Sequence, residues 1–125
     1  MNQNKWMYTG DIAVYLHSKQ FGFRINKPST VEIAVARNYA NRFENSLGKN
    51  GYFPNTTKSS RKFIHFVKKG HRPITLYLIN GTLNRMSYNK TPIESLTSLV
   101  RKKPSLQRVL NYRTQLLNKL NTSLD

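Results

Sequence analysis

The residues best suited to chemistry lie between Glu44 and Glu94, and their types favour the binding of phosphate groups. The 49 residues between these two acids include no acid and nine lysines and arginines. Basic side chains neutralise phosphates and release their counterions. The predicted nucleic-acid-binding residues are these nine cations, one histidine of the same segment, and three basic residues that follow the segment. They are Lys49, Lys58, Arg61, Lys62, Lys68, Lys69, His71, Arg72, Arg85, Lys90, Arg101, Lys102 and Lys103.

Two stretches of this segment favour contacts with a phosphate backbone. Residues 68–73, with the sequence KKGHRP, carry three cations and a histidine, and we interpret them as a phosphate clamp at a hairpin tip. Residues 57–62 mix hydroxyl groups with three further cations, a combination common in backbone contacts. The alternative is that polar loops are often basic by chance. Residues 101–103 equally fit the stabilisation of a helix C-terminus.

Aromatic residues are interleaved with these cations and offer a second kind of contact. Exposed aromatic rings stack on unpaired bases. Tyr52, Tyr77 and Tyr88 are the candidates for stacking, because a tyrosine can present its face to solvent. For Phe63 and Phe66 we favour packing in the core.

Catalytic and metal-binding patterns are weak, so we predict no catalytic residue, no metal and no cofactor. The chain has no cysteine, and His17, His65 and His71 lack the i, i+4 spacing that places two ligands on one helix face. Two-metal nucleases need clustered carboxylates, and the basic segment has none. The enzymatic alternative is a metal-independent ribonuclease, in which His71 and Tyr77 act with Arg61 and Arg85 as acid, base and charge stabilisers.

The charge balance of the whole chain supports a polyanionic partner. Twenty-one lysines and arginines face five acids, for a formal net charge of +16 over 125 residues. Self-repulsion at this level opposes compaction unless a polyanion relieves it. The length predicts one domain over 1–125. The short apolar runs and the polar N-terminus predict no membrane partner and an intracellular protein, cytoplasmic or organellar.

Two helices are predicted before the basic segment. Thr9 as N-cap and Asp11 in the first turn predict a helix over 10–19. Ser29 and Glu32 have capping-box spacing, and the apolar residues after them recur at steps near 3.6. With Gly48 as the residue that ends it, this pattern predicts a helix over 30–47.

Three strands are predicted within the basic segment. Residues 63–67 and 74–79 are apolar runs of strand length, and we expect the 68–73 loop to join them. Asn80 and Gly81 suit a type I′ turn. They predict a third strand over 82–88 that returns against the second, with Leu78 opposite Leu83 and Thr75 opposite Met86.

Two helices complete the prediction. A capping box at 91–94 with proline at the first position predicts a helix over 92–102. A leucine stripe predicts a last helix over about 105–124, whose Leu117, Leu120 and Leu124 form a candidate surface for a protein partner or for self-association. The predicted fold is therefore α+β, in the order α-α-β-β-β-α-α with a three-stranded antiparallel meander.

The leading functional hypothesis is a non-enzymatic, largely sequence-tolerant RNA-binding protein, such as a structural component of a ribonucleoprotein particle like the ribosome. RNA is favoured over DNA because cations spread along the whole chain suit a protein embedded in folded RNA. A helix over 30–47 followed by a basic hairpin resembles a winged helix over about half of the chain. That resemblance implies the alternative, a DNA-binding regulator or phage accessory protein, dimeric through its C-terminal leucines.

Overall fold

The computed structural model describes residues 5–20 and 26–102, which form seven strands, three α-helices and two short 3-10 turns. In chain order the elements are β1 (Trp6–Tyr8), α1 (Gly10–Gln20), β2 (Val31–Ala36), η1 (Arg37–Tyr39), α2 (Ala40–Lys49), β3 (Phe53–Asn55), η2 (Thr56–Lys58), β4 (Phe63–Val67), β5 (Ile74–Ile79), β6 (Arg85–Tyr88), β7 (Thr91–Glu94) and α3 (Leu96–Lys102). The predicted order and the three-stranded meander are therefore wrong.

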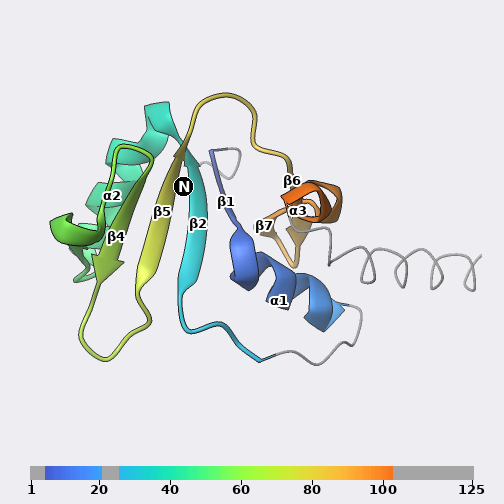
Figure 1. Ribbon diagram of the computed structural model, residues 1–125, viewed down its shortest axis with the longest axis horizontal. Helices are drawn as coiled ribbons and strands as arrows, with labels where there is room; N and C mark the ends of the chain where they lie inside the picture. Colours follow the sequence, from blue (N-terminus) through green and yellow to red (C-terminus); the bar gives the residue numbers. More distant parts are fainter. Residues whose placement is uncertain (1–4, 21–25, 103–125) are drawn as a thin grey trace, which may run out of the picture.

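All seven strands belong to one mixed sheet with the order β3-β4-β5-β2-β1-β7-β6. Strand β2 is parallel to β5, and β1 is parallel to β7, while the other neighbours are antiparallel. Figure 1 shows α2 on the side of β4 and β5, with α1 and α3 gathered beside β1 and β7. The sheet thus has two halves. One half consists of β3, β4, β5 and β2, which lie on the side of α2, and the other consists of β1, β7 and β6, which lie beside α1 and α3.

The main core lies between α2 and one face of β2, β4 and β5. Phe43 and Leu47 of α2 pack with Ile33, Val35 and Leu76, all buried. These side chains come from alternate strand positions, as a sheet with one covered face requires. We refer to this as the α2 face of the sheet, and to the other as the opposite face.

The predicted helix over 30–47 is wrong in its first half. Residues 31–36 form β2, which pairs along its whole length with β5, from Val31 beside Ile74 to Ala36 beside Ile79. The apolar residues of this stretch fit a two-residue as well as a 3.6-residue period, and β-branched side chains favour the strand. Glu32 is therefore in β2 and does not form the predicted capping box with Ser29. The helix begins only at Ala40, and it continues through Gly48 to Lys49.

The predicted hairpin at Asn80 and Gly81 is also wrong. Gly81 does have a positive φ of 98°, but the chain after it crosses to the far end of the sheet. There β6 pairs with β7, and Met86 lies beside Ile93 rather than Thr75. The tight turn lies between these two strands, at residues 89 and 90, where both φ angles are positive (48° and 67°).

The predicted helix over 92–102 begins later than expected. Residues 91–94 form β7, and α3 starts at Leu96. Ser95 caps this helix, because its hydroxyl oxygen accepts a hydrogen bond from the Ser98 amide at 3.2 Å. Pro92 therefore lies in a strand, as its second residue, and not at the first position of a helix.

Three predicted elements are confirmed. The helix over 10–19 corresponds to α1, and the strands over 63–67 and 74–79 are β4 and β5, joined by the 68–73 loop as an antiparallel pair. The predicted last helix over 105–124, with Leu117, Leu120 and Leu124, lies outside the described residues.

Candidate nucleic-acid interface

Two basic loops lie at opposite ends of β4. The 56–62 loop precedes the strand and carries Lys58, Arg61 and Lys62, all exposed. The 68–73 loop follows it and carries Lys68, Lys69 and Arg72, of which Lys69 is exposed and the other two are half-buried. Because a strand of five residues spans roughly 16 Å, the two groups of cations form two separate sites rather than one.

The 56–62 loop is tied to the sheet by an arginine from β2's end. Arg37 Nε donates to Asn80 Oδ1 at 3.0 Å, and its terminal nitrogen donates to the Arg61 carbonyl at 3.4 Å. The Ser59 hydroxyl donates to the Asn55 carbonyl at 2.7 Å and accepts from the His65 amide at 3.1 Å. These bonds fix the backbone of the loop while its cationic side chains extend into solvent.

The 68–73 loop is a tight turn packed against Tyr52, just beyond α2. The His71 amide donates to the Lys68 carbonyl at 3.0 Å, and Gly70 has a φ of 78°, which favours glycine. Lys68 Nζ lies 5.6 Å from the centre of the Tyr52 ring, and the His71 ring lies 6.4 Å from it. Tyr52 therefore supports the loop. The phosphate clamp stays a prediction.

The structure does not bring the remaining predicted residues to these loops. Lys49 is exposed at the end of α2, but four others belong to the half of the sheet beside α1 and α3: Arg85 in β6, Lys90 in the turn after it, and Arg101 and Lys102 in α3. Tyr88 is in β6 as well. Lys103 lies outside the described residues.

Sequence reasoning missed the most exposed aromatic side chain among the described residues. Phe53 in the edge strand β3 is 69% exposed, and Val67, its partner in β4, is 40% exposed. They are the exposed large hydrophobic residues of the described chain. The signal was Pro54, since proline within a short strand indicates a sheet edge. Tyr77, by contrast, packs its ring against Phe63 with centroids 6.0 Å apart.

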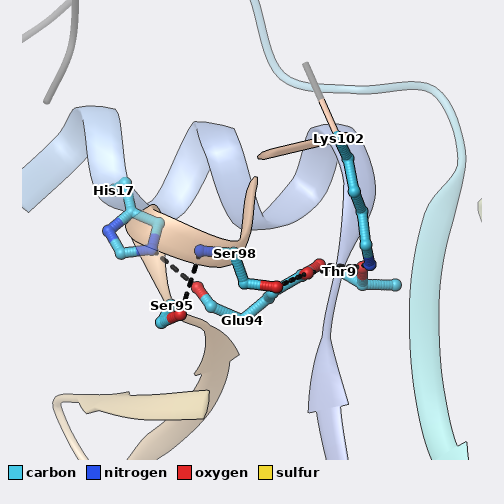
Figure 2. Close-up of polar contacts among 6 residues, drawn as sticks. All are labelled: Thr9, His17, Glu94, Ser95, Ser98 and Lys102. Carbon is cyan, nitrogen blue, oxygen red and sulfur yellow. Dashed lines mark hydrogen bonds and ion pairs between the residues drawn. The ribbon is translucent and has the colours of Figure 1, made fainter. Parts of the chain in front are cut away.

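The other half of the sheet holds a buried carboxylate, Glu94, at the end of β7 (Figure 2). Glu94 is 0% exposed. The Thr9 hydroxyl donates to its Oε1, the Ser98 hydroxyl donates to Oε2 at 2.5 Å, and Lys102 Nζ lies 2.8 Å from Oε2. We call these four residues the Glu94 cluster. His17 Nε2 lies 2.8 Å from the carbonyl oxygen of Glu94 and anchors α1 to the same point.

The Glu94 cluster keeps this carboxylate ionised. Burial alone raises the pKa of a carboxyl group, but hydrogen bonds from Lys102, Ser98 and Thr9, with the charge of Lys102, outweigh it and hold the pKa below the ordinary 4.5. Sequence reasoning treated Glu94 as a helix cap and Lys102 as a phosphate contact. Glu94 ends β7 and Lys102 ends α3, and nothing in the sequence indicated that these two residues would form an ion pair.

A pocket of about 330 Å³ on the opposite face separates the two halves. Glu32, Tyr77, Glu94 and Lys102 are part of its polar lining, and Met7 contributes to its apolar part. Glu32 Oε1 accepts from the Tyr77 hydroxyl at 3.0 Å, and Oε2 accepts from the Asp11 amide at 2.8 Å.

Glu32 is also held closely by the start of α1. Gly10 has a φ of 59°, and a Cβ atom there would overlap the Glu32 carboxylate, so this position favours glycine. Burial, followed by the charge and hydrogen bond of Glu32 and the charge of Asp11, raises the pKa of Tyr77 above its ordinary 10.0. Tyr77 therefore remains a hydroxyl donor at neutral pH.

Two general features concern metals and membranes. Within residues 5–20 and 26–102, no group of three or more histidines and acids is placed to hold a metal ion. No helix in the same part of the chain is long and apolar enough to cross a membrane.

The comparisons with known proteins identify a similar fold. No family model and no curated protein sequence matches this chain. Among solved structures, the crystal structure of the Megavirus polyadenylate synthase is similar, with a TM-score of 0.59 and 14% sequence identity. The match covers 95% of this chain and 31% of that protein. At this identity the likeness concerns the fold alone, and this chain spans under a third of the Megavirus protein.

Proposed function

We propose that this chain is a non-enzymatic RNA-binding domain that holds phosphate groups with the cations of the 56–62 and 68–73 loops. The observation that carries the proposal is the placement of charge. Six cations lie at the two ends of β4, whereas Asp11, Glu32 and Glu94 belong to the pocket and the α1 side of the sheet. A polyanion that reaches both loops neutralises the cations without approaching the acids.

The carboxylates of the pocket favour a structural role over catalysis. Each of the four carboxylate oxygens of Glu32 and Glu94 accepts a hydrogen bond from a protein donor. Chemistry that relies on carboxylates, whether for proton transfer or for metal binding, needs oxygens directed at the reacting groups. In this chain those oxygens tie β2 to β5 and α1, and they tie β7 to the end of β1 and to α3.

RNA is favoured over DNA for two reasons. The protein of similar fold is named a polyadenylate synthase, and polyadenylate is an RNA polymer. The DNA-binding alternative depended on a helix over 30–47, and residues 31–36 instead form a central strand. The ten residues of α2 that remain pack on the sheet through Phe43 and Leu47.

The test compares three variants that each lose three cations. We expect Lys58, Arg61 and Lys62 changed together to alanine, or Lys68, Lys69 and Arg72 changed together, to weaken binding of a single-stranded RNA about 100-fold at 0.1 M salt. The salt dependence should become shallower by about 2 in each case, at roughly 0.7 per phosphate. The matched control changes Lys19, Lys90 and Arg101, exposed residues in the half of the sheet beside α1 and α3.

Filter-binding titrations at several salt concentrations distinguish the outcomes. We expect the control variant to retain affinity within about threefold, because charges beyond the Debye length are screened. A control that loses as much affinity as the loop variants contradicts a localised site. Wild-type protein whose affinity does not change with salt contradicts the proposal as a whole. Synthesis of polyadenylate by the purified chain contradicts its non-enzymatic part.

A further inference from the structure

The half of the sheet that carries the basic loops has one covered face and one open face. Along β4, Phe66 points to the α2 face and is buried, so Phe63, His65 and Val67 point to the opposite face. All three are half-buried or exposed. Helices α1 and α3 lie beside β1, β2 and β7 (Figure 1), and the pocket that α3 borders reaches β5 at Tyr77 and Ile79.

Three rows of side chains form the open face, and strand register fixes their order. Phe53 lies beside Val67 in the first row, and His65 lies between Asn55 and Thr75 in the second. Phe63 and Tyr77 form the third. The outer rows are aromatic or apolar, and the middle row is polar, with His65 Nδ1 3.2 Å from Thr75 Oγ1.

The rings at the two ends of the open face are placed for stacking. The first and third rows are four residues apart along β4, which corresponds to about 13 Å. Phe53 is 69% exposed, a state that costs free energy in water and that stacking on a planar base would relieve. Bases within a duplex are already stacked and paired, so only an unpaired strand offers such faces.

Charges border the open face in a way that complements an RNA strand. The 68–73 loop adjoins the row of Phe53 and Val67, and the 56–62 loop adjoins the row of Phe63 and Tyr77. Glu32, on β2 beside Thr75, marks the inner limit, because its negative charge repels phosphates. A bound RNA strand is thereby confined to the face formed by β3, β4 and β5.

We propose that the open face of β3, β4 and β5 binds single-stranded RNA, with unpaired bases stacked at Phe53 and Phe63 and phosphates at the two basic loops. This inference rests on the proposed function and adds the strandedness of the RNA and the position of its bases. Phosphate contacts alone would hold a duplex equally well.

The experiment measures affinity for one RNA sequence as a single strand and as a duplex. We expect wild-type protein to prefer the single strand, and Phe53→Ala to weaken single-strand binding about tenfold while duplex binding stays within about twofold. Because Phe53 is exposed, its replacement leaves the core intact, and a melting curve verifies this. Phe53→Trp should bind single-stranded RNA with about the affinity of wild type, and its indole fluorescence should be quenched by single-stranded RNA. Tyr15→Ala, an aromatic residue of α1, is the matched control.

The outcomes separate this inference from the proposed function. If wild type and Phe53→Ala bind both RNA forms equally and with a steep salt dependence, the stacking platform is overturned and the phosphate-binding function stands. If neither RNA form binds, the proposed function is overturned as well. If Phe53→Ala abolishes self-association of the free protein and leaves RNA affinity unchanged, the face pairs two copies of the chain and the inference is overturned.

Discussion

The two halves of the sheet use charged residues in opposite ways. Around β7, one buried carboxylate collects donors from β1's end and from α3, and it holds three elements in place. Around β4, the cations of two loops are exposed or half-buried, and hydrogen bonds from Arg37 and from the Ser59 hydroxyl fix the backbone of one of these loops. Charge is internal and structural in the first half, external and available in the second.

This difference shows why counting cations does not locate a binding site. Lys102 and Lys69 are equally basic in sequence, but Lys102 forms an ion pair with Glu94 while Lys69 is exposed in a turn. The residues available to a phosphate are those that the fold leaves without a structural role. Three measurements on stability and binding test how far the two halves differ.

The largest effect is expected from the Glu94 cluster. Glu94→Ala removes a buried carboxylate with three donors, and we expect it to lower the free energy of unfolding by about 3 kcal/mol, near the lower limit for breaking a buried pair. Lys102 is 60% exposed and returns to water, which limits the loss. Glu44→Ala in α2, the matched control in the basic half, should change it by under about 0.5 kcal/mol.

Urea unfolding of both variants, with RNA affinity expressed per folded molecule, checks this prediction. Equal losses for Glu44→Ala and Glu94→Ala would show that the two halves do not differ in their use of acids. A loss of RNA affinity in Glu94→Ala but not in Glu44→Ala would place RNA binding in the half around β7 and would contradict the proposed site at the basic loops.

The second prediction concerns acid. Because the pKa of Glu94 is lowered in the folded state, its stabilisation is complete above the ordinary value of 4.5 and is lost as the pH falls through the folded-state pKa. We therefore expect the melting temperature of wild type to fall more steeply between pH 6 and 3 than that of Glu94→Gln. Parallel pH profiles of the two proteins would show that the cluster is not ionised as described.

The smallest effect is expected at the β6–β7 turn. Lys90 has a φ of 67°, which strains a side chain with a Cβ, so Lys90→Gly should raise the free energy of unfolding by about 0.5–1 kcal/mol. Since Lys90 lies in the half away from the basic loops, RNA affinity should change by less than about threefold. Thermal melts and binding titrations measure both, and a large loss of affinity would extend the interface to β6.

Local signals in the sequence predicted helices and strands correctly where the spacing of apolar residues fitted only one of the two periods, that of a helix or that of a strand. Helix α1 and strands β4 and β5 have clear caps or uniform apolar runs, and their positions are confirmed. Residues 31–36 fitted both periods, and long-range pairing with β5 decided for a strand. The local pattern of a single sequence does not reveal that pairing, because the partner strand is more than forty residues away.

The site was predictable to the same extent. The basic loops follow from composition and lie where loops were expected, although their roles remain predictions. The Glu94 cluster was not foreseen, since Thr9 and Glu94 are 85 positions apart and meet only through the order of strands. Phe53 was overlooked because a strand of three residues has too little pattern to recognise, and Pro54 indicates a sheet edge only once the strand itself is known.

The place of β1 in the sheet has a consequence for the order in which the fold can be completed. Its three residues are synthesised before the other strands of the sheet, and β2 supplies one neighbour within about thirty residues. The other neighbour, β7, emerges only with Ile93. Throughout that interval the nascent chain presents an unpaired edge at what becomes the middle of the sheet, open to pairing with foreign strands. Closure of the sheet is thus timed by the synthesis of β7, and slow translation upstream of that point prolongs the exposure.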